Sequence, residues 1–245
     1  MPSDAIPGRY LPPEGSALYA VGDIHGRSDL LDRLHDAILR DAMGRRAERR
    51  VAVYLGDYID RGPDSAGVVA RLAGDDTPLG GAGFERHFLR GNHDQFLLDF
   101  LDEDNGALGN WLSNGGQAAL TSWGVGPRER AADLRADLFR ALPSAHLAFL
   151  RALRFHHREG DILFVHAGLR PGVPFADQSR EDMLWIREEF LESERDFGGL
   201  VVHGHSITPE PAIRKNRIGV DTGAWRSGRL TAAVFEGDRL AFLHT

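Results

Sequence analysis

Three short predicted strands constrain the fold of this chain more than any other feature, because each is followed directly, or after one residue, by a glycine and polar side chains. They lie at residues 17–21, 51–55 and 85–89. Short strands of this kind that stop at a glycine are typical of a buried sheet. Helical periodicity over residues 28–43 and 64–72 separates them, and a further helix is expected over 95–101. The order strand–helix–strand–helix–strand predicts parallel pairing with right-handed crossovers.

The rest of the chain divides into a helical and a strand-rich part. Residues 104–153 are mainly helical in pattern, and the segment after them contains several predicted strands. These strands are expected at 161–165, 200–202, 218–220, 229–235 and 239–243. Because no linker or internal repeat divides the chain, we expect one domain over residues 16–245 with a helical insertion at 104–153. Residues 1–15, rich in proline and glycine, are expected to form a loosely ordered arm.

Side chains that bind metals follow the predicted strands. In open α/β sheets the ligand crevice lies beyond the carboxyl ends of the strands, so these side chains are expected to converge. They offer two carboxylates, one amide oxygen and three imidazoles, from Asp23, His25, Asp57, Asn92, His166 and His203. Asp57 can bridge two cations because a carboxylate has two oxygens. Two cations that share these ligands keep positions open for water and substrate, as a catalytic site requires.

The types of ligand restrict the metal and its chemistry. Three imidazoles argue against dedicated magnesium or calcium binding, whereas a mixed nitrogen and oxygen set suits Mn, Fe, Co, Ni or Zn. We expect two divalent ions, and the ligand types do not choose among these metals. Two such ions, less two carboxylates and a bridging hydroxide, leave a charge of about +1, which suits attack of hydroxide on phosphorus.

Charged groups close to these ligands suggest further roles. Arg61 follows Asp57 by four residues and Arg90 precedes Asn92 by two, and a guanidinium can hold a phosphoryl group with two donors. His93 is free to act as a general acid that protonates the leaving oxygen. Asp60 is the natural carboxylate to orient that imidazole.

Each motif also has a plainer explanation when it is taken alone. Gly-Asp-x-x-Asp is common in turns, His166 suits a hydrogen-bonded core histidine, and the segment 203–205 suits a polar loop. Asp221 fits a turn as well as a position behind the ligands. The four tryptophans are assigned to packing. The joint occurrence of the motifs at successive strand ends is what these separate explanations do not account for.

Composition removes several classes of function. The chain has 245 residues and no cysteine, which excludes disulfides, thiolate metal sites and cysteine nucleophiles. The net charge of −7 argues against nucleic-acid binding. No apolar stretch approaches the roughly 20 residues needed to span a bilayer, and no signal peptide is evident at the N-terminus. We therefore expect a cytoplasmic protein with no nucleic-acid or membrane partner.

Taken together, the motifs resemble those of the metal-dependent serine/threonine protein phosphatases of the PPP type, within the calcineurin-like metallophosphoesterases. The motifs are Gly-Asp-Ile-His-Gly at 22–26, Gly-Asp-Tyr-Ile-Asp-Arg-Gly at 56–62, Arg-Gly-Asn-His-Asp at 90–94, His-Ala-Gly at 166–168 and His-Gly-His at 203–205. The resemblance implies an α/β fold, a four-layer αββα sandwich of two mixed sheets with a dinuclear site between them.

The resemblance also implies a role for each site residue. One metal would be bound by Asp23, His25 and Asp57, and the other by Asp57, Asn92, His166 and His203. His93 with Asp60 would protonate the leaving oxygen, and Arg61 and Arg90 would hold the phosphate. The family has a further phosphate-binding arginine, for which Arg187 in Leu184-Trp185-Ile186-Arg187 is the best match.

Departures from the eukaryotic pattern bear on the substrate. Asp94 ends the third motif where many eukaryotic members have glutamate, and Asp221-Thr222-Gly223 replaces their aromatic loop, as in short bacterial relatives. The surfaces that bind regulatory subunits are missing. The resemblance implies hydrolysis of phosphoserine and phosphothreonine in a phosphoprotein, or of another small phosphoester. Alternatives are a symmetrical diadenosine tetraphosphate hydrolase, which usually lacks the counterparts of Asp60 and Arg90, and an inactive metal-binding scaffold.

Overall fold

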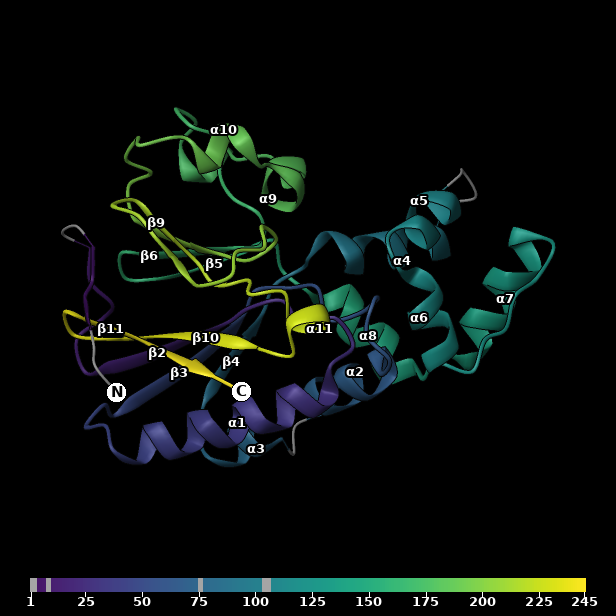
Figure 1. Cartoon of the computed structure of the whole chain (residues 1–245), viewed down its shortest axis with the longest axis horizontal. Coiled ribbons are helices and arrows are strands. Elements are labelled where there is room, and N and C mark those ends of the chain that lie inside the picture. Colours follow the sequence, from purple (N-terminus) through teal and green to yellow (C-terminus); the bar gives the residue numbers. More distant parts are fainter. Residues whose placement is uncertain (1–3, 8–9, 75–76, 103–106) are drawn as a thin grey trace.

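Two mixed β-sheets lie face to face in the computed structural model, which describes residues 4–7, 10–74, 77–102 and 107–245 (Figure 1). The strand order is β1-β11-β10-β2-β3-β4 in the first sheet and β5-β6-β7-β9-β8 in the second. The first sheet consists of β1 (Asp4–Ala5), β2 (Ser16–Val21), β3 (Arg49–Tyr54), β4 (Glu85–Phe88), β10 (Thr231–Glu236) and β11 (Arg239–His244). The second consists of β5 (His156–Glu159), β6 (Ile162–Val165), β7 (Leu200–His203), β8 (Ala212–Ile213) and β9 (Arg217–Gly219).

The first sheet is parallel across the three strands predicted from the sequence. β2 pairs with β3 and β3 with β4 in parallel, so their carboxyl ends meet at one edge. The helix α1 (Ser28–Met43) joins β2 to β3, and α2 (Ser65–Ala73) with α3 (Pro78–Gly81) joins β3 to β4. Side chains alternate along β2, so that Leu18 and Ala20 face the second sheet while Tyr19 packs among helices.

The second sheet brings its own parallel strands to the same edge. β6, β7 and β9 run parallel to one another, with β5 and β8 antiparallel at the two ends. Phe164 and Val202 face the first sheet. Leu163 and Val201 face outward against Phe190. The apolar layer between the sheets therefore fixes how the two sets of strand ends face each other.

Helices cover the outer face of each sheet (Figure 1). α1 and α3 lie under the first sheet, while α9 (Arg180–Trp185) and α10 (Glu188–Leu191) lie over the second. The succession helix, sheet, sheet, helix is the four-layer sandwich that the resemblance implied, and that fold prediction is confirmed.

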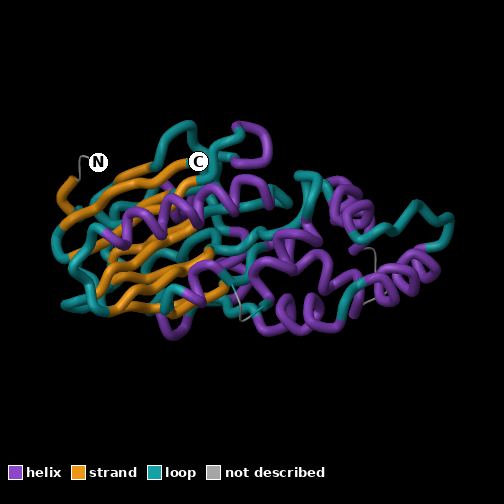
Figure 2. The backbone as a smooth tube through the Cα atoms, turned by 90° about the horizontal axis from the view of Figure 1, so that it is seen from below, coloured by secondary structure: helices purple, strands orange, loops and turns teal. Residues whose placement is uncertain are grey.

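Further helices extend the molecule beyond the ends of the strands (Figure 2). They are α4 (Asn92–Asp102), α5 (Ala107–Ser113), α6 (Gly116–Ser122), α7 (Ala131–Ala141) and α8 (Ser144–Ala152), with η1 (Phe175–Asp177) and α11 (Ala224–Ser227) later in the chain. Residues 104–106 of the expected insertion lie outside the described residues. Trp111 and Leu150 carry this region into the core that also contains Leu97.

The start of the chain is attached to the first sheet. β1 pairs with β11, and the Ile6 N–H donates to the Asp238 carbonyl at 2.9 Å. Ile6 is buried between the sheets. The described part of the expected N-terminal arm is thus in contact with the core, and residues 1–3 and 8–9 lie outside the described residues. No helix in the described ranges combines the length and apolarity needed to cross a membrane.

Candidate metal centre

Backbone strain is concentrated where the two sheets present their strand ends. Among the described residues, the non-glycine positions with positive φ are His25, Asp57, Asp60, Arg61 and His205. Left-handed backbone costs a non-glycine residue about 1–3 kcal/mol and is typical of functional sites. All five residues come from the predicted motifs. The unfavourable backbone conformation of these loops therefore accompanies the orientation of their side chains toward one site.

Asp57 lies at the centre of the buried cluster. Its Oδ2 is 3.4 Å from His25 Nε2 and 3.5 Å from His166 Nε2, and its Oδ1 accepts a hydrogen bond from the His93 N–H at 3.0 Å. Two groups of mutually close ligand atoms share it, namely His25–Asp57–His93 and Asp57–His166–His205. Burial acts to raise the pKa of Asp57, and protonation of the surrounding imidazoles would act to lower it. A shared carboxylate between two groups of ligands is what a bridging role requires.

His25 is oriented for coordination through Nε2. Its Nδ1 donates to the Ile59 carbonyl at 2.8 Å, which fixes the tautomer and leaves a lone pair on Nε2. Burial lowers the pKa of His25 to about 3, so the ring is neutral at pH 7. The Arg61 guanidinium, with Nη1 3.0 Å from this nitrogen, is the cation that faces the lone pair.

His166 and Asn92 provide a direct test of whether a cation fits. His166 Nδ1 donates to the Leu55 carbonyl at 2.9 Å, so its Nε2 carries a lone pair. That lone pair faces the Asn92 amide oxygen at 2.9 Å. Two acceptors at this distance repel each other unless a cation lies between them. The arrangement, with the Asn92 oxygen turned toward the imidazole, therefore fits a metal ion.

His205 joins the same group of ligands. Its Nδ1 lies 2.9 Å from the Asn92 amide oxygen, and its Nε2 is buried without a hydrogen-bond partner among the described residues. Burial lowers the pKa of His205 and keeps the ring neutral. An unpartnered buried imidazole beside a carboxylate suits a metal ligand.

His203, the residue predicted from the sequence, lies outside this group. Its Nε2 is also buried without a hydrogen-bond partner among the described residues, but it belongs to neither group of ligand atoms. Its Nδ1 lies 3.0 Å from the Gly204 carbonyl, and its ring meets the Phe190 ring edge to face at 5.0 Å. A side chain at Gly219 would contact the ring within 3.2 Å. His203 is the last residue of β7, whereas Asp23, Asp57 and His166 follow the ends of their strands. The strand expected from the sequence ends at residue 202, so the sequence placed His203 directly after it, and the offset that favours His205 is seen in the structure.

Asp23 and Asp221 add buried negative charge beside Asp57. Asp23 accepts from the His205 N–H at 3.0 Å and shares a hydrogen bond with Asp221, which also accepts from the Gly223 N–H at 2.9 Å. Burial, then repulsion from Asp221 and Asp57, raises the pKa of Asp23 well above its usual value. Burial likewise raises the pKa of Asp221 to about 6. Divalent cations would relieve this repulsion, so the charge of the site fits the predicted metals.

Two glycines make room for these carboxylates. A Cβ at Gly91 would lie 2.0 Å from Asp57 Oδ1, and a Cβ at Gly204 would lie 2.0 Å from Asp23 Oδ1. Asp94 fixes the same loops from behind, because its carboxylate accepts from the N–H groups of Asp57 and Gly91 at 2.9 Å and of Tyr58 at 3.1 Å. The backbone around Asp57 is therefore held at both ends.

A second set of contacts positions His93. Its Nδ1 lies 2.7 Å from Asp60 Oδ2, and both Asp60 oxygens accept from the Trp111 indole N–H at 3.0 Å. Asp60 is fully buried, and burial raises its pKa. Trp111 is a functional contact that the sequence did not reveal, since it is 51 residues from Asp60 and looks like any core tryptophan.

The three predicted phosphate-binding arginines lie in different surroundings. Arg61 reaches the His25 side of the cluster and packs over the Trp225 ring at 5.5 Å. Arg187 bonds to Ser206 Oγ at 3.5 Å, and its charge contributes to the lowered pKa values of His166 and His205.

Arg90 is occupied away from the cluster. Its guanidinium donates to Gln95 Oε1 at 2.9 Å and to the Arg151 carbonyl at 3.1 Å, and it packs over Phe155 at 5.1 Å. The structure thus gathers Arg61 and Arg187, with Asp23, His25, Asp57, Asn92, His93 and His166, around the cluster, and it places Arg90 and His203 elsewhere.

Buried carboxylates with facing imidazole lone pairs, between two mixed sheets, describe a metallophosphoesterase centre. The model of the calcineurin-like phosphoesterase family matches residues 17–228 of the chain. The chain belongs to that family, as its motifs predicted, and the family uses a dinuclear metal site.

Individual relatives are named for two activities. A symmetrical bis(5'-nucleosyl)-tetraphosphatase of Acidovorax sp. is 30% identical over 79% of this chain, which spans 58% of the length of that relative. Serine/threonine-protein phosphatase 1 of Salmonella typhimurium is 31% identical over 88% of this chain and 90% of its own length. Among solved structures, a cold-active protein-tyrosine phosphatase of a Shewanella species is similar in fold, with a TM-score of 0.62 at 20% identity over 99% of this chain and 82% of its own.

Proposed function

We propose that the chain is a dinuclear metal phosphomonoesterase that removes phosphate from phosphoserine and phosphothreonine in proteins. The observation that carries this proposal is the Trp111–Asp60–His93 chain beside the Asp57 cluster, because it supplies a supported general acid next to two groups of metal ligands. A general acid is needed to expel an alkoxide, which is a poor leaving group.

The first proposed ligand set keeps the residues that the resemblance implies, and the second adds His205 from the geometric group of Asp57 and His166. Asp23, His25 and Asp57 hold the first metal, and Asp57, Asn92, His166 and His205 hold the second, with His205 in place of the predicted His203. Mn²⁺ is our first choice among the metals that suit a mixed set of imidazole and oxygen donors, with Fe, Zn, Co and Ni as alternatives. When bound, paired divalent ions polarise the phosphoryl oxygens and increase the acidity of water at the site.

The protein's own residues perform the remaining steps. Arg61 and Arg187 bind the phosphoryl oxygens, because both guanidinium groups lie beside the cluster. His93 gives a proton from Nε2 to the leaving serine or threonine oxygen, since its Nδ1 faces Asp60. The Asp60 carboxylate stabilises the protonated ring, and Trp111 keeps that carboxylate in place. Arg90 has a structural role, because its guanidinium bonds the third motif to the end of α8.

A relative named as a protein phosphatase supports the proposal. The Salmonella phosphatase aligns with 88% of the chain and 90% of its own length. The second candidate is symmetrical hydrolysis of diadenosine tetraphosphate, which the Acidovorax relative supports at almost the same identity. We expect a cytoplasmic protein without a regulatory subunit.

A direct competition tests the proposal. Protein loaded with Mn²⁺ is given a phosphoserine peptide and diadenosine tetraphosphate side by side, and phosphate and ADP are measured separately. We expect a higher kcat/KM for the peptide. Faster release of ADP would assign the chain to the second candidate function, and no hydrolysis of either substrate or of p-nitrophenyl phosphate would indicate an inactive scaffold.

A further inference from the structure

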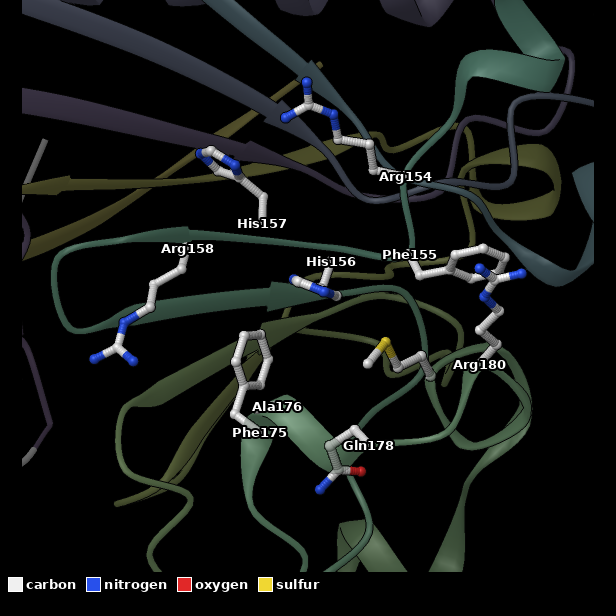
Figure 3. Close-up of a pocket in the computed structure, with 10 residues that line it drawn as sticks. Arg154, Phe155, His156, His157, Arg158, Phe175, Ala176, Gln178 and Arg180 are labelled. Atoms are coloured by element: carbon white, nitrogen blue, oxygen red, sulfur yellow. The ribbon is translucent and has the colours of Figure 1, made fainter.

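A separate cavity of about 540 Å³ lies beside β5, at the edge of the second sheet (Figure 3). We call it the β5 pocket. It is lined by Arg154, Phe155, His156, Arg158, Phe175 and Arg180, among others. None of the described residues that line it is an aspartate or a glutamate. In a protein with a net charge of −7, a cavity bordered by arginines without carboxylates is a local exception that favours anions.

Two of these arginines have charge available for a ligand. Arg180 packs over the Phe155 ring at 4.8 Å, and Arg158 donates from Nε to the Gly160 carbonyl at 2.8 Å. Neither makes an ion pair with a carboxylate in the described part of the chain. Figure 3 shows their guanidinium groups at opposite ends of the pocket, with His156 and Phe175 between them. The pocket therefore offers two separated positive charges and an apolar middle.

Helix α9 connects this pocket to the metal centre. Arg180 and Met183 of α9 line the pocket. At the other end of the helix the Trp185 ring lies 6.3 Å from the His205 ring and 5.1 Å from that of Phe96. Five residues of helix span about 7.5 Å. Together with the 6.3 Å between the Trp185 and His205 rings, this makes a path of about 14 Å. An extended peptide advances about 3.3 Å per residue, so about four residues, within a range of three to five, separate a phosphoresidue at the metals from a side chain at Arg180.

The aromatic rings of the pocket favour an extended chain over a nucleobase. The Phe155 ring is already covered by the guanidinium groups of Arg90 and Arg180. The Phe175 ring meets the His156 ring edge to face at 4.9 Å. Stacking of a base would have to displace one of these contacts, whereas acidic side chains can reach Arg180 and Arg158 directly.

We propose that the β5 pocket binds acidic residues three to five positions from the phosphoresidue of a peptide substrate. The inference rests on the proposed protein phosphatase function and adds a substrate preference to it. Arg180 pairs with carboxylates at these positions, and Arg158, at the opposite end of the pocket, pairs with a carboxylate farther along the peptide. They act on substrate binding and not on the bond that breaks.

The test uses two phosphoserine peptides that differ at positions three to five on both sides, where one has glutamate and the other alanine. Wild-type protein should hydrolyse the glutamate peptide with a kcat/KM about fivefold higher, mainly through KM, and the preference should weaken in high salt. Arg180→Ala should abolish the preference. Hydrolysis of p-nitrophenyl phosphate, which is too small to reach the pocket, should be unchanged.

A matched control removes the same charge elsewhere. Arg33 is exposed on α1, in the helical layer under the other sheet, so Arg33→Ala should retain the peptide preference. Equal kcat/KM for the two peptides in the wild type would overturn the inference, and so would a loss in Arg33→Ala as large as in Arg180→Ala. A higher KM for diadenosine tetraphosphate in Arg180→Ala, with the peptides unaffected, would assign the pocket to a nucleotide instead.

Failure of the proposed function would look different. In that case neither peptide is hydrolysed, although p-nitrophenyl phosphate is. Fluorescence anisotropy of the unphosphorylated glutamate peptide then tests the pocket by itself. Binding that Arg180→Ala removes and Arg33→Ala retains would support it, and absence of binding to the wild type would refute it.

Discussion

Two clusters of histidine and carboxylate in this protein look alike by distance and differ in their chemistry. One surrounds Asp57, and the other consists of His87, His157 and Glu159, whose ligand atoms also lie within 4.8 Å of one another. In the second cluster, Arg49 donates to both oxygens of Glu159, at 2.6 and 3.0 Å. His157 Nε2 lies 2.8 Å from the same carboxylate. The negative charge of Glu159 is therefore already neutralised by the protein.

The Asp57 cluster lacks such neutralisation. Asp23, Asp57 and Asp221 are all buried there, and Arg61 is the cation that interacts with them. Its imidazoles point lone pairs at the carboxylate and at the Asn92 oxygen, whereas the rings of His87 and His157 stack on each other at 3.7 Å. Proximity of ligands alone does not define a metal site. Buried negative charge that the protein does not neutralise, together with acceptor atoms that face one another, indicates a metal site. The following predictions test this difference between the Asp57 and Glu159 clusters.

The largest effect is expected when the bridging carboxylate is lost. Asp57→Asn removes the charge shared by both sets of ligands, so we expect loss of both metals and at least a 10³-fold decrease in kcat. Metal content by mass spectrometry, with activity on p-nitrophenyl phosphate, measures this. The control is His157→Ala in the other cluster, which should keep two metals per chain. Retention of both metals by Asp57→Asn would contradict the bridging role.

A smaller effect separates the two histidines of the 203–205 segment. His205→Ala should weaken binding of one metal by about 10- to 100-fold and leave the other in place, because His205 belongs to one set of ligands. His203→Ala removes a ring that packs on Phe190 and should leave metal binding intact. Titration of the metal-free variants with Mn²⁺ gives the stoichiometry and affinity. The reverse pattern would restore the assignment made from the sequence.

Loss of the Trp111 hydrogen bond to Asp60, which positions the general acid, should lower kcat moderately and affect nothing else. Trp111→Phe removes the N–H that holds Asp60 and retains most of the ring volume. We expect kcat to fall by about tenfold, less than the 10²-fold or more that follows loss of the acid in His93→Ala. Metal content and KM should be unchanged in both variants. A parallel loss of metal would mean that Trp111 supports the ligands instead.

The smallest effect concerns stability at the neutralised cluster. Burial acts to raise the pKa of Glu159, but Arg49 and His157 outweigh it and hold that pKa below its usual value. A carboxylate with a lowered pKa stabilises the fold above its unfolded-state pKa and loses that contribution as the pH falls through its folded-state pKa. Glu159→Gln should therefore cost about 1 kcal/mol at pH 7 in the metal-free protein and progressively less below about pH 4.3. Urea unfolding of the wild type and the variant at pH 7 and below about pH 4.3 measures the difference. A cost that does not depend on pH would contradict this prediction.

Much of this architecture follows from periodicity and strand endings. The boundaries of α1 agree with the prediction, and β2, β3 and β4 lie within two residues of the expected strands. β5 was missed because its sequence, His-His-Arg-Glu, is entirely polar. Glu159 in this strand pairs with Arg49 on another strand, and no local pattern reports such a contact.

The residues of the Asp57 cluster were predictable to the extent that they follow strands. Asp23, His25, Asp57, Asn92 and His166 could be found in this way. The orientation of Arg90 toward the end of α8 could not, because that contact spans 61 residues. The choice between neighbouring histidines depends on where β7 ends and on the left-handed backbone of His205, with φ of 60°.

The two glycines that face the carboxylates have a consequence for how this centre can vary. Asp57 and Asp23 each occupy space that a methyl group at position 91 or 204 would fill. Replacing either glycine with a larger residue therefore cannot be used to change the metal preference, because the added side chain would collide with a carboxylate of the cluster. A change in the space around the ions therefore requires substitution of the ligands themselves or of the side chains that pack against them.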